Sequence, residues 1–333
     1  MEQENIKKKF SYIGVCYWLF MMLSFMFRQI SRTIVSVNNI ELNDWGKYLI
    51  SMIPLWGMAF PIFYLLIRRV PKSEVGNEKR SLLGLLKIYP MSLMFIFAGS
   101  IIGNIIAIIA SLITKTTIKN SVISTIMGRT VLASFVFACV MAPIFEELAF
   151  RKILIDRVGQ YSQKYAIILS GVLFGLFHGN VFQIFYATAL GMIFAYVYIK
   201  SGRVYYTMIL HGIINFMHGV FPMLFMKKLN IDEILKLSQM DPNDPETIKK
   251  VIEVYSDPNF LAYLGWVFFI FALAVLGIVL LILQRKKIKL DESKSIIQEK
   301  KYIPDMFINT GMALFAVGTL FEVVYSILSQ VMK

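Results

Sequence analysis

The sequence predicts an all-α fold, a polytopic transmembrane helical bundle of eight or nine spans. Hydrophobic residues make up 57% of the 333-residue chain and charged residues 17%, whereas soluble domains are about 45–50% apolar and about 25% charged. The mean hydropathy is +0.65. Apolar runs close to the ~20 residues that cross a bilayer recur along the chain. These observations exclude a soluble globular protein and a disordered chain.

Each expected span is an apolar run bounded by polar residues. The runs lie at residues 10–27, 48–67, 88–113, 130–150, 163–179, 180–199, 204–225, 260–283 and 306–330. The fifth run is short and the last contains Asn309 and Glu322, which leaves the count at eight or nine. The chain is therefore expected to divide into four parts, namely spans 1–3 (1–128), spans 4–7 (129–225), a polar loop (226–259) and the C-terminal spans (260–333). The sequence Asp241-Pro242-Asn243-Asp244-Pro245 in the loop is typical of turns and linkers.

Basic residues set the expected orientation and partners. The formal net charge is +13, and 22 of the 34 Lys and Arg residues fall in the N-terminal segment and the even-numbered loops. The positive-inside rule therefore predicts a multi-pass integral membrane protein with a cytoplasmic N-terminus. In such a protein the excess charge is expected to meet anionic lipid headgroups, and nucleic acid is not an expected partner.

Ionisable groups inside spans are costly, about 2.5–3.5 kcal/mol each on insertion scales, so they indicate where function lies. Three clusters occur between residues 146 and 215. The first is Glu146-Glu147-Leu148-Ala149-Phe150-Arg151 at the end of the fourth run. Glu147 and Arg151 are spaced i,i+4 and are expected to pair on one helix face. Glu146 points elsewhere and is left without a local partner, so it is a candidate general base. The alternative is an ordinary charged helix end at the headgroups.

The second cluster is Phe174-Gly175-Leu176-Phe177-His178, in which Phe174 and His178 share a helix face. Small residues recur every four positions here and in the next run, at Gly171, Gly175, Gly179 and at Ala187, Gly191, Ala195. This spacing predicts close packing of the two helices. A histidine hydrogen-bonded inside the bundle is the alternative for His178.

The third cluster is His211-Gly212-Ile213-Ile214-Asn215, which places two hydrogen-bond donors one turn apart on one face. Such donors suit a developing oxyanion, although inter-helix hydrogen bonds would explain them equally. His218 lies a heptad after His211 and is expected to have a structural role. Together the clusters carry two of the three histidines of the chain, which makes independent structural accidents a poor explanation.

At these residues the sequence resembles the CAAX prenyl endopeptidase and bacteriocin-processing family, also called the CPBP, Abi or type II CAAX protease family. The family pattern is EExxxR, then FxxxH, then HxxxN or HxxxD. It reads here as Glu146-Glu147-Leu148-Ala149-Phe150-Arg151, Phe174-Gly175-Leu176-Phe177-His178 and His211-Gly212-Ile213-Ile214-Asn215. The order and separations match over about residues 129–225. The three-part pattern is fairly specific, whereas EExxxR alone would not be.

The resemblance implies an intramembrane endopeptidase with a helical core of about eight spans. It implies that Glu146 activates the attacking water with help from His178, and that His211 and Asn215 stabilise the tetrahedral oxyanion. Glu147, Arg151 and Phe174 would support the site. The implied substrates are C-terminal prenylated peptides or proteins, or small secreted, bacteriocin-like peptides.

Zinc is the cofactor to consider, because the family is often described as metalloproteases. A catalytic zinc needs three protein ligands, which Glu146, His178 and His211 could supply. HExxH and CxxC spacings are absent, and Cys16 and Cys139 sit in apolar runs. We therefore expect a metal-free site.

Depth in the membrane is a difficulty for this site. Strict alternation of the spans puts Glu146 near the cytoplasmic side and His178 near the far end of the fifth span. The two meet only if span four extends past Arg151 or if span five ends within the membrane. We expect a water-filled cavity that opens to the cytoplasm, since irregular backbone at depth is tolerated when it lines a cavity.

Two other functions stay open from the sequence. A non-catalytic membrane protein, such as a bacteriocin immunity factor or a scaffold associated with peptide export, would use the same polar residues to stabilise the bundle. A transporter or proton relay would also need them, but it predicts inverted repeats. The sequence contains no visible repeat of that kind.

Overall fold

The computed structural model describes residues 2–79, 81–120, 125, 127–229, 234, 237, 240–241, 244–291, 296 and 303–332. All regular elements within these residues are helices. Eight of the helices described are long and apolar enough to cross a membrane, and a ninth apolar helix, at Gln163–Phe177, is shorter. The predicted fold class, an all-α polytopic bundle, is confirmed.

Each of the first three spans begins before the apolar run that predicts it, and the first also continues beyond the end of its run. Helix α1 covers Glu2–Val37. The second span is continuous through α2 (Asp44–Met52), the π-helix η1 (Ile53–Ala59) and α3 (Phe60–Ile67). The third span consists of α4 (Leu82–Leu86) and α5 (Ile88–Thr114).

The fourth span is one continuous helix of 28 residues, Val131–Val158. Its segments are α7 (Val131–Ser134), η2 (Phe135–Met141), α8 (Ala142–Glu147), η3 (Leu148–Ile153) and α9 (Leu154–Val158), of which η2 and η3 are π-helical. The predicted end at residue 150 is therefore wrong. The helix continues because its basic residues find partners inside the bundle: the Arg157 side chain donates to the carbonyl oxygens of Ile67 and Ile153, at 2.9 and 2.8 Å.

The next helices are α10 (Gln163–Phe177), α11 (Val181–Ser201), α12 (Val204–Asn215), the π-helix η4 (Phe216–Val220) and α13 (Met223–Met226). The predicted close packing of α10 on α11 is confirmed. A Cβ atom on Gly175 would lie 2.5 Å from the Ile184 carbonyl oxygen, and one on Gly191 would lie 2.8 Å from the Gly171 Cα atom. Only glycine allows these backbones to approach so closely.

The C-terminal part contains α15 (Pro245–Ser256), α16 (Pro258–Gln284), the 3₁₀-helix η5 (Arg285–Lys287), α17 (Ile303–Phe307) and α18 (Thr310–Val331). Within the predicted polar loop at 226–259 the chain forms α15, with Asp244 as its N-cap and Pro245 in its first turn. Residues 230–233, 235–236, 238–239 and 242–243 of that loop lie outside the described residues. The last span begins at Thr310 because the Asn309 side chain caps it.

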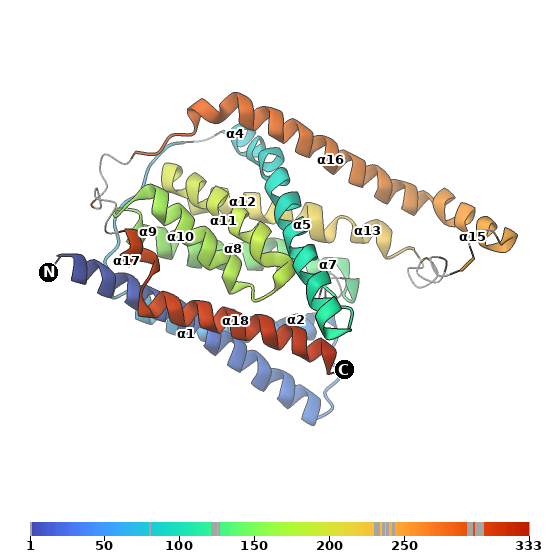
Figure 1. The fold of residues 1–333 in the computed structure, drawn as a ribbon, viewed down its shortest axis with the longest axis horizontal. Coiled ribbons are helices and arrows are strands. Elements are labelled where there is room, and N and C mark those ends of the chain that lie inside the picture. The colour runs from blue at the N-terminus through green and yellow to red at the C-terminus, as the bar shows by residue number, and fades with distance from the viewer. Residues whose placement is uncertain are drawn as a thin grey trace.

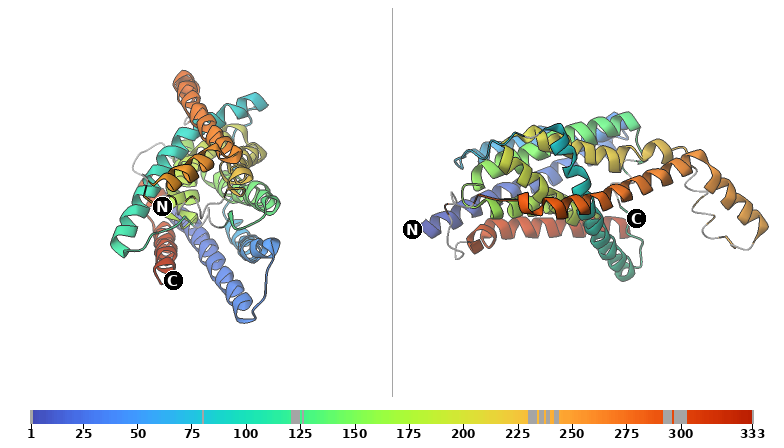
Figure 2. Two further views of the ribbon diagram at one scale, coloured as in Figure 1. Left: turned by 90° about the vertical axis from the view of Figure 1, so that its right-hand side faces the viewer. Right: turned by 90° about the horizontal axis from the view of Figure 1, so that it is seen from above.

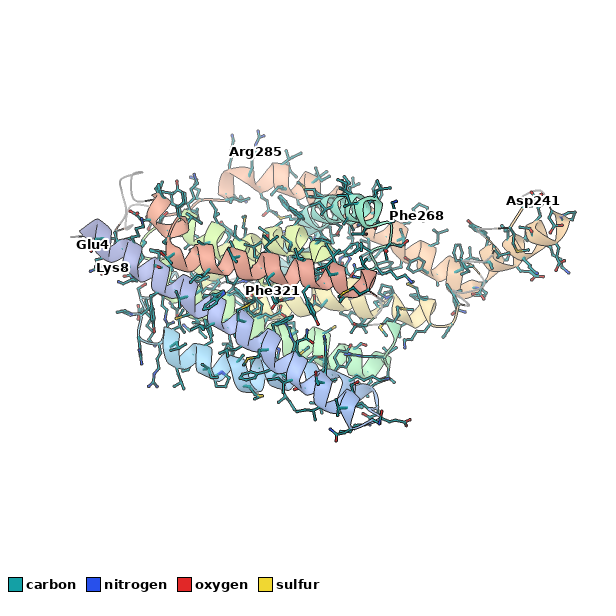
Figure 3. The ribbon with its side chains drawn as sticks, turned by 60° about the horizontal axis from the view of Figure 1, so that its bottom comes forward. Glu4, Lys8, Asp241, Phe268, Arg285 and Phe321 are labelled. Atoms are coloured by element: carbon teal, nitrogen blue, oxygen red, sulfur yellow. The ribbon has the colours of Figure 1, made fainter. Side chains whose placement is uncertain are left out.

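Helices α1 and α18 run side by side along one edge of the bundle, and α16 lies along the opposite edge (Figure 1). Helices α8, α10, α11 and α12 lie between these edges, while α5 crosses them obliquely, as the turned views also show (Figure 2). The N-terminus and Arg285 lie at one end, whereas Asp241 and the C-terminus lie at the other (Figures 1 and 3).

The outer helices present apolar side chains. On α16 Phe268 is 65% exposed, and on α18 Phe321 is 49% exposed (Figure 3). Contiguous apolar surface of this kind is unusual for a soluble monomer and matches a lipid environment. The chain is an integral, multi-pass membrane protein.

Candidate active site

Two adjacent glutamates at the end of α8 have different surroundings. The side chain of Glu147 is completely buried, whereas that of Glu146 is 18% exposed. The two residues sit between the π-helical segments η2 and η3, and π turns are frequent at functional sites. Of the two carboxylates, that of Glu146 is therefore the one open to a small molecule such as water.

The predicted ion pair between Glu147 and Arg151 is confirmed. Arg151 Nε lies 2.9 Å from Glu147 Oε2, and both side chains have no exposed surface. The guanidinium also stacks 4.4 Å from the centre of the Phe174 ring and 5.4 Å from that of Phe194. Since desolvating an ion costs several kcal/mol, pairing and cation–π contacts together hold this arginine in place.

His211 connects α12 to both glutamates. Its Nδ1 lies 2.9 Å from Glu147 Oε1, and its Nε2 lies 3.7 Å from Glu146 Oε2. The result is a continuous polar chain from Arg151 through Glu147 and His211 to Glu146. The sequence did not reveal the contact of His211 with Glu147, because the two residues are 64 positions apart and belong to different motifs.

His178 is the C-cap of α10, and its ring stands edge-on to Phe174 with the centroids 4.9 Å apart. Its Nδ1 donates to the Phe174 carbonyl oxygen at 2.8 Å. Because that carbonyl only accepts, Nδ1 carries the proton and Nε2 is the basic nitrogen of the neutral ring. Phe174 joins the second and third motifs, since its ring centroid lies 4.9 Å from that of His178 and 5.8 Å from that of His211.

The expected conflict of depth between Glu146 and His178 is resolved by the lengths of two helices. Glu146 lies twelve residues before the end of α9 at Val158, about 18 Å along the helix. Helix α10 has only 15 residues and rises about 22 Å from the same end. Ser170 Oγ donates to the Phe150 carbonyl oxygen at 2.7 Å, which fixes the register of the two helices. Span four does extend past Arg151, as one of the two predicted solutions required.

Asn215 also turns toward the fourth span. Its Nδ2 donates to the carbonyl oxygen of Ala138, at 2.7 Å, and this uses one of its two protons. A Cβ atom on Gly212 would lie 2.7 Å from the Cys139 carbonyl oxygen, so α12 packs tightly on η2 at this point. His218 lies apart from the cluster, with its Nε2 3.4 Å from the Tyr89 hydroxyl oxygen.

The predicted zinc ligands do not form a metal-binding group. Within the part of the chain that the structure describes, no three His, Cys, Asp or Glu side chains are grouped as ligands of one ion. His211 has Nδ1 on Glu147 and His178 has Nδ1 on a backbone carbonyl, and these two contacts engage only the Nδ1 atom of each ring. The metal-free site that the sequence favours therefore stays a prediction.

The three motifs lie within one stretch that matches a known family. Residues 128–217 match the family described as type II CAAX prenyl endopeptidase Rce1-like. The chain carries an Rce1-like segment. This finding confirms the resemblance that the motifs indicated, and the segment includes every site residue named above from Ala138 to Asn215.

One curated relative supports the same assignment. The "Putative membrane peptidase YdiL" of Bacillus subtilis (strain 168) is 24% identical to the chain over 157 residues. That alignment covers 46% of this chain and 64% of the relative, so the chain spans less than two thirds of its length. No solved structure matches the chain. Residues 128–217 are thus similar to a family of endopeptidases, and the matching relative is described as a putative membrane peptidase.

Proposed function

We propose that the chain is an intramembrane endopeptidase that hydrolyses a peptide bond in a membrane-associated peptide or protein, either CAAX-type or bacteriocin-like. The observation that carries the proposal is the polar chain Arg151–Glu147–His211–Glu146 inside the Rce1-like segment. Burying ionisable groups in the core of a membrane bundle costs free energy, so such groups are mostly kept where function needs them. Here they leave one carboxylate, that of Glu146, partly open beside His211.

The first step is attack by water. Glu146 accepts a proton from the water while the basic Nε2 of His178 orients it by accepting its second hydrogen. The new C–O bond forms at the scissile carbonyl carbon, and the carbonyl oxygen becomes an oxyanion. Because Nδ1–H of His211 already donates to Glu147, Nε2 can donate only from the imidazolium form; in that form, Nε2–H and the second Nδ2 proton of Asn215 donate to the oxyanion. Typical contributions are about 10²–10⁴-fold for a positioned base and about 10²–10³-fold for one oxyanion donor.

The second step breaks the C–N bond. Glu146 returns its proton to the departing amine nitrogen, the oxyanion collapses, and a carboxylic acid and an amine leave. Glu147 keeps Nδ1 of His211 engaged, so that Nε2 faces the reacting group. Arg151 balances the buried charge of Glu147. No step of this proposal passes through a metal ion, in keeping with the metal-free site that the sequence favours.

We infer that the site opens to the cytoplasm and that the N-terminus is cytoplasmic. The proposal is supported by the position of the N-terminal lysines and Arg285 at one end of the bundle (Figure 3). It predicts that single cysteines near His178 are labelled by an impermeant thiol reagent from the cytoplasmic side and not from the outside. Labelling from the outside only would overturn it.

The decisive experiment compares purified wild type, Glu146→Gln and Glu4→Gln in detergent. Glu4→Gln is the matched control, because it makes the same change at an exposed i,i+4 pair with Lys8. Each protein is incubated with prenylated CAAX peptides and with small secreted peptides, with and without a chelator. We expect cleavage by wild type and the control, and a loss of at least about 10²-fold in Glu146→Gln.

Three outcomes would count against the proposal. Equal cleavage by Glu146→Gln would remove the assigned base. Loss of cleavage in the presence of the chelator would show that a metal ion, and not the carboxylate of Glu146 alone, activates the water. Absence of cleavage by well-folded wild type on both peptide classes would favour the non-catalytic immunity factor or scaffold.

A further inference from the structure

A second buried carboxylate lies outside the Rce1-like segment. Glu322 is in the middle of α18 and is 7% exposed. Its Oε1 lies 3.6 Å from Arg28 Nη2 on α1, and that oxygen has no hydrogen-bond partner within the described residues. Removing one member of such a pair leaves an uncompensated charge, which is strongly destabilising. A carboxylate retained at this depth therefore calls for a reason beyond packing.

Glu322 packs directly on the turn that follows His178. A Cβ atom on Gly179 would lie 2.6 Å from Glu322 Oε2 and 2.9 Å from Glu322 Cβ. Gly179 also has a φ of +55°, a conformation that glycine adopts without strain. The glycine is therefore required twice, once by the backbone and once by the carboxylate that covers it.

The turn continues the hydrogen bonds at the end of α10. The His178 amide donates to the Gly175 carbonyl oxygen at 3.3 Å, and the Gly179 amide donates to the Leu176 carbonyl oxygen at 3.1 Å. Asn180 then caps α11. A cavity lies beside the turn, lined in part by Gly179, Asn180 and Val323. The cavity has room for about one water molecule, and Glu322 contacts the turn at Gly179, so this contact limits how far the turn can shift.

We propose that Glu322, held by Arg28, is a positioning residue that fixes the turn at Gly179 and thereby the ring of His178. The proposal rests on the proposed function for its kinetic consequence. It extends the site to α1 and α18, which lie outside residues 128–217. A displacement near 1 Å in a catalytic group costs up to about 10²-fold in rate, so a contact one residue from His178 is able to change the rate measurably.

The test uses Glu322→Ala, which removes the contact, and Glu322→Gln, which keeps its volume and removes the ion pair. Glu4→Gln is again the control. With a cleavable peptide, we expect Glu322→Ala to lower kcat about 10-fold with KM changed less than about 2-fold. In a His178→Ala background the same substitution should cost nothing further. An equal loss in both backgrounds would show that Glu322 acts independently of His178 and would overturn the proposal.

A readout without substrate separates this proposal from the proposed function. The rate at which diethyl pyrocarbonate modifies His178 is followed by mass spectrometry, with His218 as the internal reference. We expect Glu322→Ala, and less so Glu322→Gln, to change the His178 rate several-fold while His218 and the Glu4→Gln control stay unchanged. Each outcome of this measurement decides the positioning role. Unchanged His178 reactivity in a folded Glu322 variant overturns it. Should Glu322→Ala fail to fold, the reactivity of His178 in Glu322→Gln decides by the same criterion. If wild type cleaves nothing but His178 reactivity shifts, the proposed function fails and the positioning role stands.

Discussion

Glu147 contacts two residues with its two carboxylate oxygens: Oε2 lies 2.9 Å from Arg151 Nε on its own helix, and Oε1 lies 2.9 Å from His211 Nδ1 on α12. The contact with Arg151 neutralises a buried charge, and the contact with His211 fixes the orientation of the imidazole ring. The neighbouring carboxylate, that of Glu146, faces Nε2 of the same ring. The two glutamates of one motif are thus divided between support and reaction.

Glu147→Gln and Glu146→Gln are expected to differ in kind. Glu147→Gln leaves the buried guanidinium without its counter-charge and should destabilise the protein by about 3–5 kcal/mol. Glu146→Gln should leave the melting temperature nearly unchanged and remove activity, because its side chain is partly exposed. Thermal unfolding in detergent, paired with the peptide assay, measures both effects. Equal destabilisation by the two substitutions would contradict the division.

Arg151→Met tests how the guanidinium is held. It keeps apolar bulk against Phe174 and Phe194 but leaves the buried charge of Glu147 without its guanidinium partner, so we expect a loss of about 3–5 kcal/mol. The double variant Arg151→Met with Glu147→Gln should recover part of that loss. Lys8→Met, on an exposed pair, should show no measurable change. An additive double variant would show that the ion pair has no coupling energy.

Gly175→Ala should disrupt the interface of α10 with α11. The added methyl group would meet Thr188 Oγ1 and the Ile184 carbonyl oxygen, and we expect a loss of about 1–3 kcal/mol. Gly265→Ala on α16 is the matched control, since nothing lies within 4 Å of its Cβ position. There alanine should be neutral or stabilising by up to about 1 kcal/mol, as its helix propensity is higher. Comparable losses at both positions would contradict the close approach.

Orientation is tested with single cysteines in a chain lacking Cys16 and Cys139. Cysteines at Lys8 and at Arg285 should react with an impermeant reagent from the cytoplasmic side, and a cysteine at Asp241 from the other side, because they lie at opposite ends of the bundle (Figure 3). Reaction of all three from one side would contradict the arrangement of the spans. Reaction of Lys8 and Arg285 from the outside would reverse the predicted orientation.

The spans and the site clusters were predictable because each depends on local sequence. Apolar runs give a strong signal in a membrane protein, and the i,i+4 pair of Glu147 and Arg151 follows from one helix alone. The end of span four was not predictable, since Arg157 stays inside the helix only by bonding to Ile67, 90 residues away.

Contacts between the motifs could not be predicted from the sequence, because they also depend on residues far apart in the chain. Whether His211 faces Glu147 depends on the rotation of α12 against α8, and the π turns in η2 and η3 shift that rotation from the value for ideal helices. The contact of Glu322 with Gly179 joins a terminal helix to the core over 143 residues. In each case the local sequence was enough to single out the polar residue, whereas its partner depended on how whole helices pack.

The shortness of α10 has a consequence for the depth of the turn that follows it. Its 15 residues rise about 22 Å, about 8 Å less than the hydrocarbon core of a typical membrane. Helix α10 packs on α9, α11 and α18 and most of its side chains are buried or half-buried, so protein and not lipid borders the chain beyond its end. Irregular backbone is tolerated at that depth only in such surroundings, so the short helix keeps the turn at Gly179, and His178 before it, below the membrane surface.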